Sequence, residues 1–303
     1  MESLEQLNKQ LDSLDELRSI VKTMKALSAA NIHQYEQAVD ALGGYYRTVE
    51  MGLHVALKDM DPASFLQPKA SGQSPVAAIV FGSDHGLCGR FNEEIAEYTA
   101  GRLASTPSAH LSPLVLAVGA RVAGSLENAG LKINENFMTP GSASQITATV
   151  QQILLTIDQW REDQGVRYVF LFYNRHSGQQ GYRPTGVELL PVNLKRFHRL
   201  EQAPWPSRSL PTFTLPRPVL FRQLLDQYLF VLVFRACAES QASEHASRLS
   251  AMQSAERNLD ERMSDVTMDY RRARQTVITS ELLELVSGFE ALKPKNKKGP
   301  ESI

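Results

Sequence analysis

The chain has 303 residues, of which 43% are hydrophobic and 21% charged, a composition typical of a soluble folded protein and not of a disordered one. Its 32 Lys and Arg residues nearly balance its 33 Asp and Glu residues, so the net charge of -1 gives no reason to expect nucleic acid as a partner. Cys88 and Cys237 lie far apart and have no metal-binding spacing, so we expect free thiols in a reducing compartment.

The N-terminal segment is acidic and periodic from its start. It has neither the basic start and apolar run of a signal peptide nor the Arg-rich pattern of a transit peptide, so we expect the protein to stay where it is made. The most apolar run, residues 228–234 (YLFVLVF), is far shorter than the ~20 residues that span a bilayer. We therefore expect no direct membrane insertion.

Residues 1–60 are predicted to form a long N-terminal helix. No proline occurs between residues 4 and 60, and apolar side chains recur every three or four residues. The stripe is formed by Leu4, Leu7, Leu11, Leu14, Ile20, Met24, Leu27, Tyr35, Val39, Leu42, Tyr46, Val49 and Leu53. Gly43, Gly44 and Gly52 weaken the helix, because each costs up to about 1 kcal/mol relative to alanine. We expect a bend or a close approach of another segment near Gly43.

Residues 61–217 are predicted to form an α/β domain. Short apolar runs, such as VAAIVFG at 76–82 and YVFLFY at 168–173, alternate with helical stretches, which indicates a largely parallel sheet. The interval between the run at 168–173 and the next one leaves no room for a crossover helix, so we expect antiparallel pairing of the last strand or two. Within the domain, Asn92 is predicted to cap the start of a helix and Gly165 to end another.

Residues 218–290 are predicted to form a second long helix, followed by a flexible basic tail at 291–303. Neither glycine nor proline occurs from Val219 to Ser287, a length of about 100 Å if it is all helical, which is too long for a compact domain. Because one long helix enters the α/β domain and the other leaves it, we expect them to pair as an antiparallel coiled coil with the domain inserted between them. The second helix would overhang the first by about ten residues.

The run FGSDHGLCGRFN at 81–92 lies between a predicted strand and a predicted helix, where phosphate-binding loops are found. It lacks the spacings of G-x-x-x-x-G-K-[ST] and G-x-G-x-x-G, so a glycine-rich turn is favoured over a nucleotide site. Asp84, His85 and Cys88 could supply a nucleophile and a base, but such a trio often occurs by chance. The histidines have no metal-binding spacing, and we expect neither a cofactor nor a metal.

The run RRARQTVITSELLELVSG at 271–288 places a dense set of polar groups on the last turns of the second helix. It offers arginines, hydroxyls, a glutamine and glutamates, but no combination of base, nucleophile or metal ligands. We therefore expect these side chains to contact another protein.

Three motifs together resemble the gamma subunit of the rotary F-type ATP synthases. ASEHASRLSAM at 242–252 is similar to the family's A-S-E-x-x-A-R-M-x-A-M, and RQTVITSELLELVSG at 274–288 to its R-Q-x-x-I-T-x-E-L-x-E-I-V-x-G. DHGLCGRFN at 84–92 is similar to its D-x-G-L-C-G-x-x-N. The resemblance covers nearly the whole chain.

This resemblance implies a rotor shaft that does no bond chemistry itself. Its coiled coil would enter a ring of alpha and beta subunits, while the α/β domain would contact the epsilon subunit and the membrane c-ring. It would couple ion-driven rotation of the membrane ring to ATP synthesis or hydrolysis in the beta subunits. The protein would lie peripherally at the cytoplasmic face of the bacterial inner membrane.

The resemblance also implies six partner-contact residues, which are Arg274, Gln275, Arg248, Thr279, Glu281 and Met24. Arg274 and Gln275 match a pair that hydrogen-bonds a beta-subunit loop, and Met24 matches a methionine that faces the beta-subunit lever. The other three match positions implicated in coupling.

The chain departs from the family in LDSLDELRSIV, a stretch that is basic or neutral in the family. Antiparallel pairing would bring residues near 14 opposite residues near 270. We therefore expect Asp12 and Asp15 to offset Arg271 and Arg272, with each exposed pair adding about 0.2–1 kcal/mol. The coupling ion, proton or sodium, stays open.

Two other interpretations stay open on the sequence. The chain could be an α/β enzyme that binds a small molecule and dimerises through its helices, or a coiled-coil adaptor outside any rotary machine. Nucleotide binding by the isolated chain would favour the first, and failure to copurify with alpha and beta subunits would favour the second.

Overall fold

The computed structural model describes residues 4–57, 74–106, 112–176, 181–192 and 212–292. Backbone contacts divide the chain into two compact units, which we call unit 1 (residues 1–24 and 252–303) and unit 2 (residues 25–251). Two long helices, α1 (Leu4–Leu57) and α6 (Arg217–Leu292), contribute residues to both units. Both long helices predicted from the apolar periodicity are confirmed. The predicted domain boundaries at 60, 217 and 290 stay predictions.

The centre of unit 2 is a five-stranded sheet with the strand order β3-β2-β1-β4-β5. Its strands are β1 (Val76–Phe81), β2 (Leu114–Val118), β3 (Glu135–Phe137), β4 (Tyr168–His176) and β5 (Tyr182–Leu190). The pairs β1–β2, β1–β4 and β2–β3 are parallel, whereas β4 and β5 pair antiparallel. The predicted α/β domain, with its largely parallel sheet and antiparallel last pair, is confirmed.

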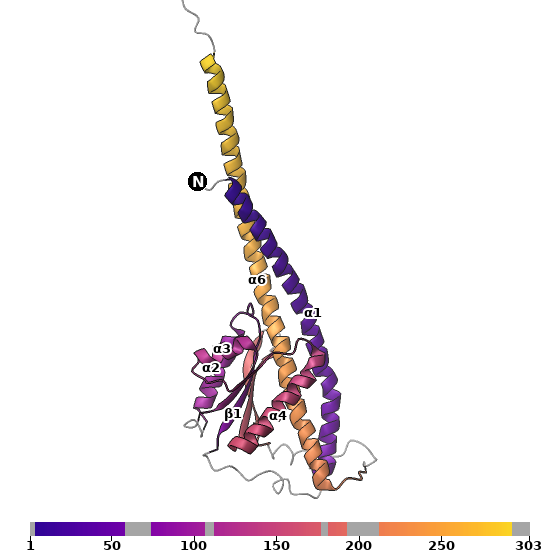
Figure 1. Ribbon diagram of the computed structural model, residues 1–303. Helices are drawn as coiled ribbons and strands as arrows, with labels where there is room; N and C mark the ends of the chain where they lie inside the picture. Colours follow the sequence, from indigo (N-terminus) through magenta and orange to yellow (C-terminus); the bar gives the residue numbers. More distant parts are fainter. Residues whose placement is uncertain (1–3, 58–73, 107–111, 177–180, 193–211, 293–303) are drawn as a thin grey trace, which may run out of the picture. The chain divides into compact units, whose positions relative to one another are not determined.

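Helices cover both faces of this sheet, which is why β1 and β2 are continuous apolar runs. On one face, Ala78 packs with Ile95 of α2 (Phe91–Ala104) and Val122 of α3 (Ala120–Asn128). On the other, Ile79 packs with Ile153 of α4 (Ile146–Gln164) and with the unit 2 parts of α1 and α6 (Figure 1). Successive residues of β1 thus serve opposite cores, as the two-residue period of a strand requires.

Within unit 2, α1 and α6 contact each other in reverse order along the chain. The Tyr35 ring stacks on His245, with 5.6 Å between ring centroids. Further along α1, the Tyr45 hydroxyl donates to Gln227 Oε1 at 2.6 Å. Because the α6 residue number falls as the α1 residue number rises, these parts of the two helices run antiparallel.

The glycines of α1 differ in their surroundings from what the sequence predicted. α1 continues as a helix through Gly43 and Gly44, and a Cβ at either position would meet nothing within 4 Å. The close approach lies at Gly52, where a Cβ would be 2.9 Å from Leu224 Cδ2. The close approach predicted near Gly43 is therefore wrong, because the glycine without room for a side chain is Gly52, which faces Leu224 of α6. The alternative, a bend near Gly43, stays a prediction.

The end of α4 agrees with the sequence. The helix stops at Gln164, and Gly165 follows with a φ of 66°, a left-handed conformation that glycine adopts without steric cost. Among the described helices, we find none with a stretch long and apolar enough to cross a bilayer.

Candidate partner-binding site

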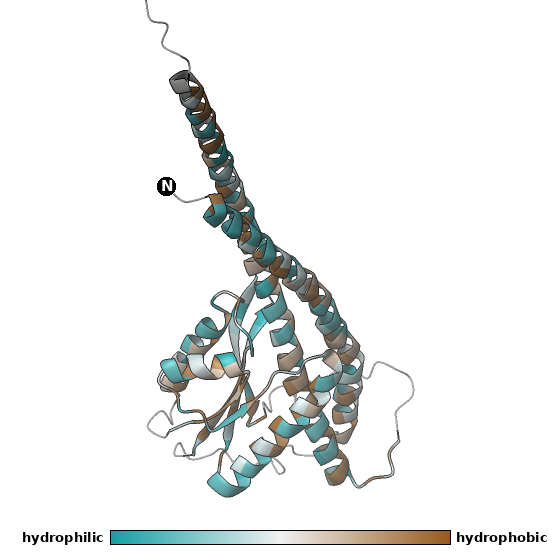
Figure 2. Ribbon diagram, turned by 45° about the horizontal axis from the view of Figure 1, so that its top comes forward, coloured by the Kyte–Doolittle hydropathy of each residue, from teal (hydrophilic) through white to brown (hydrophobic). Residues whose placement is uncertain are grey.

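The last part of α6, residues 271–289, is almost fully exposed. Seven large apolar side chains on it are 41% to 71% exposed, namely Val277, Ile278, Leu282, Leu283, Leu285, Val286 and Phe289. Figure 2 shows hydrophobic and hydrophilic segments mixed along this end of the helix. Positions 278, 282, 285 and 289 follow the spacing that places side chains on one helix face. An exposed apolar stripe of this kind is typical of surfaces that bind another protein.

Four of the predicted contact residues lie on this same stretch. Arg274, Gln275 and Glu281 are exposed, and within the described part of the chain their side chains make no hydrogen bond or ion pair. The Thr279 hydroxyl already donates to the backbone carbonyl of Gln275 at 2.8 Å. The guanidinium, amide and carboxylate groups are thus available to a partner, while the hydroxyl donor is used within the helix.

Met24 lies on α1 in the same unit and is partly exposed. Leu17 and Ile20 are 50% and 56% exposed, and their spacing to Met24 places all three on one face of the helix. The apolar stripe predicted along α1 is therefore only partly buried. Its exposed portion forms a second apolar surface in unit 1.

Arg248 is placed differently from the other five predicted residues, because it belongs to unit 2 and is 6% exposed. Its Nη1 atom lies 2.7 Å from Glu244 Oε1, one turn earlier on α6. Its Nη2 atom donates to the backbone carbonyls of His85 and Gly86, at 3.3 and 3.4 Å. The structure thus places five of the six residues in unit 1. The guanidinium of the sixth, Arg248, contacts residues of its own chain.

The loop that receives Arg248, residues 82–90, is closed by hydrogen bonds to the start of α2. The Ser83 backbone N–H donates to Asn92 Oδ1 at 3.0 Å, and Asn92 Nδ2 donates to Ser83 Oγ at 2.8 Å. Since α2 starts at Phe91 with Arg90 as its N-cap, the prediction of Asn92 as the cap is wrong. The side chain of Asn92 reaches back over the loop instead.

This loop lies at the carboxyl ends of β1 and β4, where the strand order reverses and where α/β sheets usually bind small ligands. Here α6 packs onto it, and the Ser247 hydroxyl donates to the Cys88 carbonyl at 2.6 Å. Cys88 is 1% exposed, and burial raises the pKa of its thiol, which makes it a poor nucleophile. These contacts favour a structural turn over the site of a small-molecule enzyme.

Two residues beside Arg248 were not singled out from the sequence. Burial raises the pKa of the Glu244 carboxyl to about 7, although the Arg248 guanidinium acts in the opposite direction. Burial and the charge of Arg248 lower the pKa of the His245 imidazole to about 4. The available signal was that Glu244 precedes Arg248 by four residues, the spacing of an ion pair on one helix face.

The charges between α1 and α6 in unit 1 follow a different register from the predicted one. Arg18 Nε lies 2.8 Å from Asp260 Oδ1, and Arg272 pairs with Asp269 of its own helix at 3.8 Å. Within the described residues, no ion pair joins the charges that we predicted to offset one another, and that prediction is wrong for Asp12, Asp15, Arg271 and Arg272.

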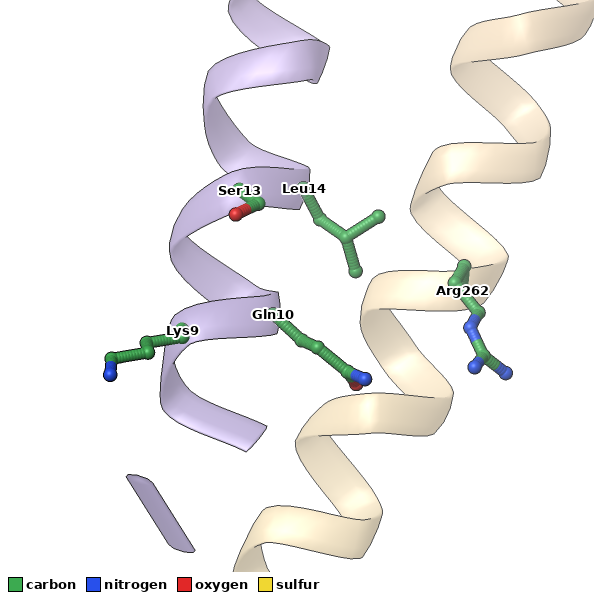
Figure 3. Close-up of a pocket in the computed structure, with 5 residues that line it drawn as sticks. All are labelled: Lys9, Gln10, Ser13, Leu14 and Arg262. Carbon is green, nitrogen blue, oxygen red and sulfur yellow. The ribbon is translucent and has the colours of Figure 1, made fainter. Parts of the chain in front are cut away.

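The residues that line a shallow hollow in unit 1 show why the predicted ion pairs do not form. It has a volume of about 350 Å³ and is lined by Lys9, Gln10, Ser13, Leu14 and Arg262. Figure 3 shows Gln10 and Leu14 extending from α1 towards α6, whereas Lys9 extends away. Residue 14 therefore lies near residue 262, about two helical turns from the predicted position near 270.

Comparison with known proteins agrees with this arrangement. The family described as ATP synthase matches residues 3–292. A protein called ATP synthase gamma chain from Geotalea daltonii is 31% identical over 300 residues, and one from Anaeromyxobacter sp. (strain Fw109-5) is 30% identical over 298 residues. Each alignment covers 97% of this chain and 100% of the relative.

Solved structures share the fold. A chain of the Euglena gracilis mitochondrial ATP synthase (OSCP/F1/c-ring, rotational state 3) has a TM-score of 0.60 at 19% identity and covers 99% of both chains. A chain of the Tetrahymena thermophila mitochondrial ATP synthase (central stalk/c-ring) has a TM-score of 0.50 at 21% identity, covering 78% of this chain and 99% of the other.

An α/β domain between two long helices, one of which ends in an exposed apolar and polar stretch, defines a subunit that acts by binding other subunits. The chain belongs to the family of ATP synthase gamma chains. It is a non-catalytic subunit, because the catalytic sites of these synthases lie on the beta subunits. The resemblance seen in the three motifs is confirmed.

Proposed function

We propose that this chain is the central rotor shaft of an F-type ATP synthase and that the exposed end of α6 is the part that enters the ring of alpha and beta subunits. The observation that carries the proposal is the exposure of residues 271–289, where apolar and unpaired polar side chains share one helix. A helix end of this composition is stable in water only at the cost of exposed apolar area, and a ring of partner subunits would remove that cost.

The two kinds of side chain on this end would do different work. Apolar contacts depend little on direction and would hold the helix centrally in the ring. Hydrogen bonds from Arg274 and Gln275 depend on direction, so they form with a beta subunit in some rotary positions and not in others. Such contacts give each of the three beta subunits a different free energy, which is the requirement for coupling rotation to ATP turnover.

We further propose that α1 and α6 pair as an antiparallel coiled coil. Support comes from contacts within each unit, namely Arg18 with Asp260 in unit 1 and Tyr45 with Gln227 in unit 2. A paired shaft resists bending and twisting better than one helix, and a rotor that transmits torque needs such stiffness.

The proposed partners are the alpha and beta subunits, the epsilon subunit and the membrane c-ring. The proposed location is peripheral, at the cytoplasmic face of the bacterial inner membrane. Arg274, Gln275, Thr279, Glu281 and Met24 are the proposed contacts of the shaft with the ring. Arg248 is also a proposed coupling residue, although its guanidinium contacts its own chain.

Truncation tests the rotor proposal directly. We expect a chain that ends at residue 273 to lose coupled ATP synthesis when it is assembled with its alpha and beta subunits and the membrane sector, because the contact stretch is gone. A chain that ends at residue 292 is the matched control, since it lacks only the tail outside the described residues. Normal coupling by the shorter chain would refute the proposal.

A milder test concerns the polar contacts alone. We expect Arg274→Ala combined with Gln275→Ala to leave copurification with alpha and beta subunits intact and to lower ATP turnover about tenfold or more, because hydrogen bonds to charged groups are each worth about 1.5–3 kcal/mol. Arg257→Ala, also exposed on α6, is the control. Equal turnover in both variants would remove Arg274 and Gln275 from the contact site.

A further inference from the structure

The loop at residues 82–90 is held from three directions. From α2, Asn92 bonds Ser83 through both its amide atoms. From the neighbouring edge of the sheet, the backbone N–H of Ala120 and the backbone N–H and hydroxyl of Thr139 donate to the Asp84 carboxylate at 2.6 to 2.9 Å. The third set of bonds comes from α6.

The α6 contacts arise from two consecutive residues and reach three carbonyls of the loop. The Ser247 hydroxyl donates to the Cys88 carbonyl at 2.6 Å, and Arg248 Nη2 donates to the carbonyls of His85 and Gly86. Both donors lie about one and a half turns beyond Ala242, the last α6 residue of the core cluster that contains the sheet. A helix that donates side-chain hydrogen bonds to successive carbonyls fixes both the position and the rotation of the loop relative to the helix axis.

The backbone between these carbonyls is in an uncommon conformation. Leu87 has a φ of 63°, which costs a residue with a Cβ about 1–2 kcal/mol, and its side chain is 62% exposed. Its conformation is therefore not stabilised by burial of its own side chain. The carbonyls of Gly86 and Cys88, on either side of Leu87, both accept hydrogen bonds from α6, and these bonds help to hold the conformation.

The geometry of Arg248 depends on Glu244. Arg248 is 6% exposed and its Nη1 atom lies 2.7 Å from the Glu244 carboxylate, which leaves Nη2 directed at the loop. Nη1 also lies 3.4 Å from His245 Nδ1. A buried guanidinium that is fixed on one side has little freedom to leave its acceptors on the other.

We propose that Ser247 and Arg248 form an internal clamp that locks the 82–90 loop to α6, with Glu244 as the positioning residue for Arg248. The clamp prevents α6 from turning about its own axis relative to the sheet domain. The role of the clamp in torque transfer rests on the proposed rotor function. The existence of the clamp does not depend on that function. Arg248 then affects coupling from inside its own chain.

Amide hydrogen exchange in the full-length chain tests the clamp. We expect Ser247→Ala to speed exchange of the amides at 84–89 by about fivefold, the factor that corresponds to the loss of one net hydrogen bond. Arg248→Met should speed it by more, because its guanidinium donates to two loop carbonyls and pairs with Glu244. Ser254→Ala and Arg257→Met are matched controls, because this exposed pair lies on the same helix and, within the described residues, its guanidinium bonds only to that serine. Loop exchange that matches the controls would overturn the clamp.

The role of Glu244 is tested by a conservative rescue and a double-mutant cycle. We expect Glu244→Leu to speed loop exchange, and Glu244→Gln to restore most of the protection because its amide oxygen can still accept from Arg248. In an Arg248→Met background, Glu244→Leu should add nothing to loop exchange. An equal effect in both backgrounds would show a general packing role and would overturn the positioning role.

A third measurement separates the clamp from the rotor proposal. We expect the Ser247→Ala variant to assemble with its alpha and beta subunits and the membrane sector, and its ratio of gradient-driven ATP synthesis to ATP hydrolysis to fall about twofold or more. An unchanged ratio with faster loop exchange would refute the torque role and leave the clamp. Failure of the unmodified chain to assemble would refute the rotor proposal and leave the exchange result standing.

Discussion

Two stretches of α6 carry similar densities of polar side chains, yet they use them in opposite ways. In the stretch at 241–248, Glu244 and Arg248 are buried and bonded to each other, and Arg248 also bonds to the loop after β1. In the stretch at 271–289, Arg274 and Gln275 are exposed and make no side-chain bond within the described residues. A polar motif on a helix therefore indicates that the residues matter, but burial decides whether they serve the fold or a partner.

The difference has a physical cause in what surrounds each stretch. Residues 236–242 pack into the core between the sheet and α1, so any polar group nearby must find a partner in the chain. Within the described residues, the end of α6 at 271–289 belongs to no buried cluster, so its polar groups can stay hydrated. Removal of a polar group should therefore reduce stability in the first stretch and binding in the second.

The largest expected effect comes from removing the buried Arg248, and the exposed Arg274 is its comparison. Arg248→Ala should lower the free energy of unfolding by about 3–5 kcal/mol at pH 8, because it leaves the buried Glu244 carboxylate without its cation. Arg274→Ala should change it by less than about 0.5 kcal/mol, as is usual for an exposed side chain. Urea denaturation of the full chain measures both.

A double variant serves as the control for this pair. Glu244→Gln with Arg248→Met should recover most of the stability lost in Arg248→Ala, because no buried charge then remains unpaired. Similar stabilities of Arg248→Ala and Arg274→Ala would contradict the contrast between the two stretches.

Two glycines offer a second contrast, because substitution by alanine should lower the stability at one of them and raise it at the other. A Cβ at Gly82 would lie 2.3 Å from Val122 Cβ, an atom fixed to the backbone of α3, so Gly82→Ala should destabilise by about 1–3 kcal/mol. A Cβ at Gly288 would meet nothing within 4 Å, and Gly288→Ala should stabilise the helix by up to about 1 kcal/mol. Thermal unfolding of both variants measures the difference, and a loss of stability in Gly288→Ala would show that the helix end is packed.

Periodicity was enough to predict both long helices and the α/β domain. A continuous apolar stripe and alternating apolar runs are features of the local sequence, and they do not depend on which residues meet in the packed structure. The register between α1 and α6 was not predictable in the same way. Shifting one helix along the other by two turns changes which residues meet, and only the packed structure brings Leu14 to Arg262 rather than to residues near 270.

The candidate site was predictable in part. The motif at 271–288 pointed to a partner surface because its residue types suit no catalytic site, and the structure places Arg274, Gln275 and Glu281 on an exposed helix. The inward turn of Arg248 was not predictable, since it depends on the carbonyls of His85 and Gly86, more than 150 residues earlier in the chain. Contacts between distant segments leave no trace in local spacing.

The pH dependence of stability sharpens the contrast, because the buried stretch holds two groups with opposite shifts. The pKa of Glu244 is raised from 4.5 to about 7. Its contribution to the free energy of unfolding is therefore lost as the pH rises from 4.5, the pKa in the unfolded chain, through 7. His245 has its pKa lowered to about 4, so its contribution is lost as pH falls from 6.5 towards 4. Between about pH 5 and 6.5 the two effects oppose each other.

Single substitutions separate these two effects. In Glu244→Gln the remaining histidine makes stability rise with pH in this window, whereas in His245→Gln the remaining carboxyl makes it fall. The slopes should differ by about 1.4–2.7 kcal/mol per pH unit, the value for one to two protons. The comparison cancels other titrating groups of the chain, and parallel slopes would show that neither group is perturbed in the folded protein.

The smallest expected effect concerns the ion pair of unit 1. The side chains of Arg18 and Asp260 are 34% and 48% exposed, whereas those of Arg248 and Glu244 are 8% and 6% exposed. Solvent screens the exposed pair, so a double-mutant cycle on Arg18→Met and Asp260→Asn should give a coupling of about 0.2–1 kcal/mol. Raising the salt concentration to about 1 M should remove most of this coupling, because the Debye length falls to about 3 Å.

The same cycle on Glu244→Gln and Arg248→Met should give a larger coupling that changes little with salt, since water and ions do not reach that pair. Equal salt sensitivity of the two couplings would mean that the polar groups of the inner stretch are as hydrated as those of unit 1, and the distinction between the two parts of α6 would not hold.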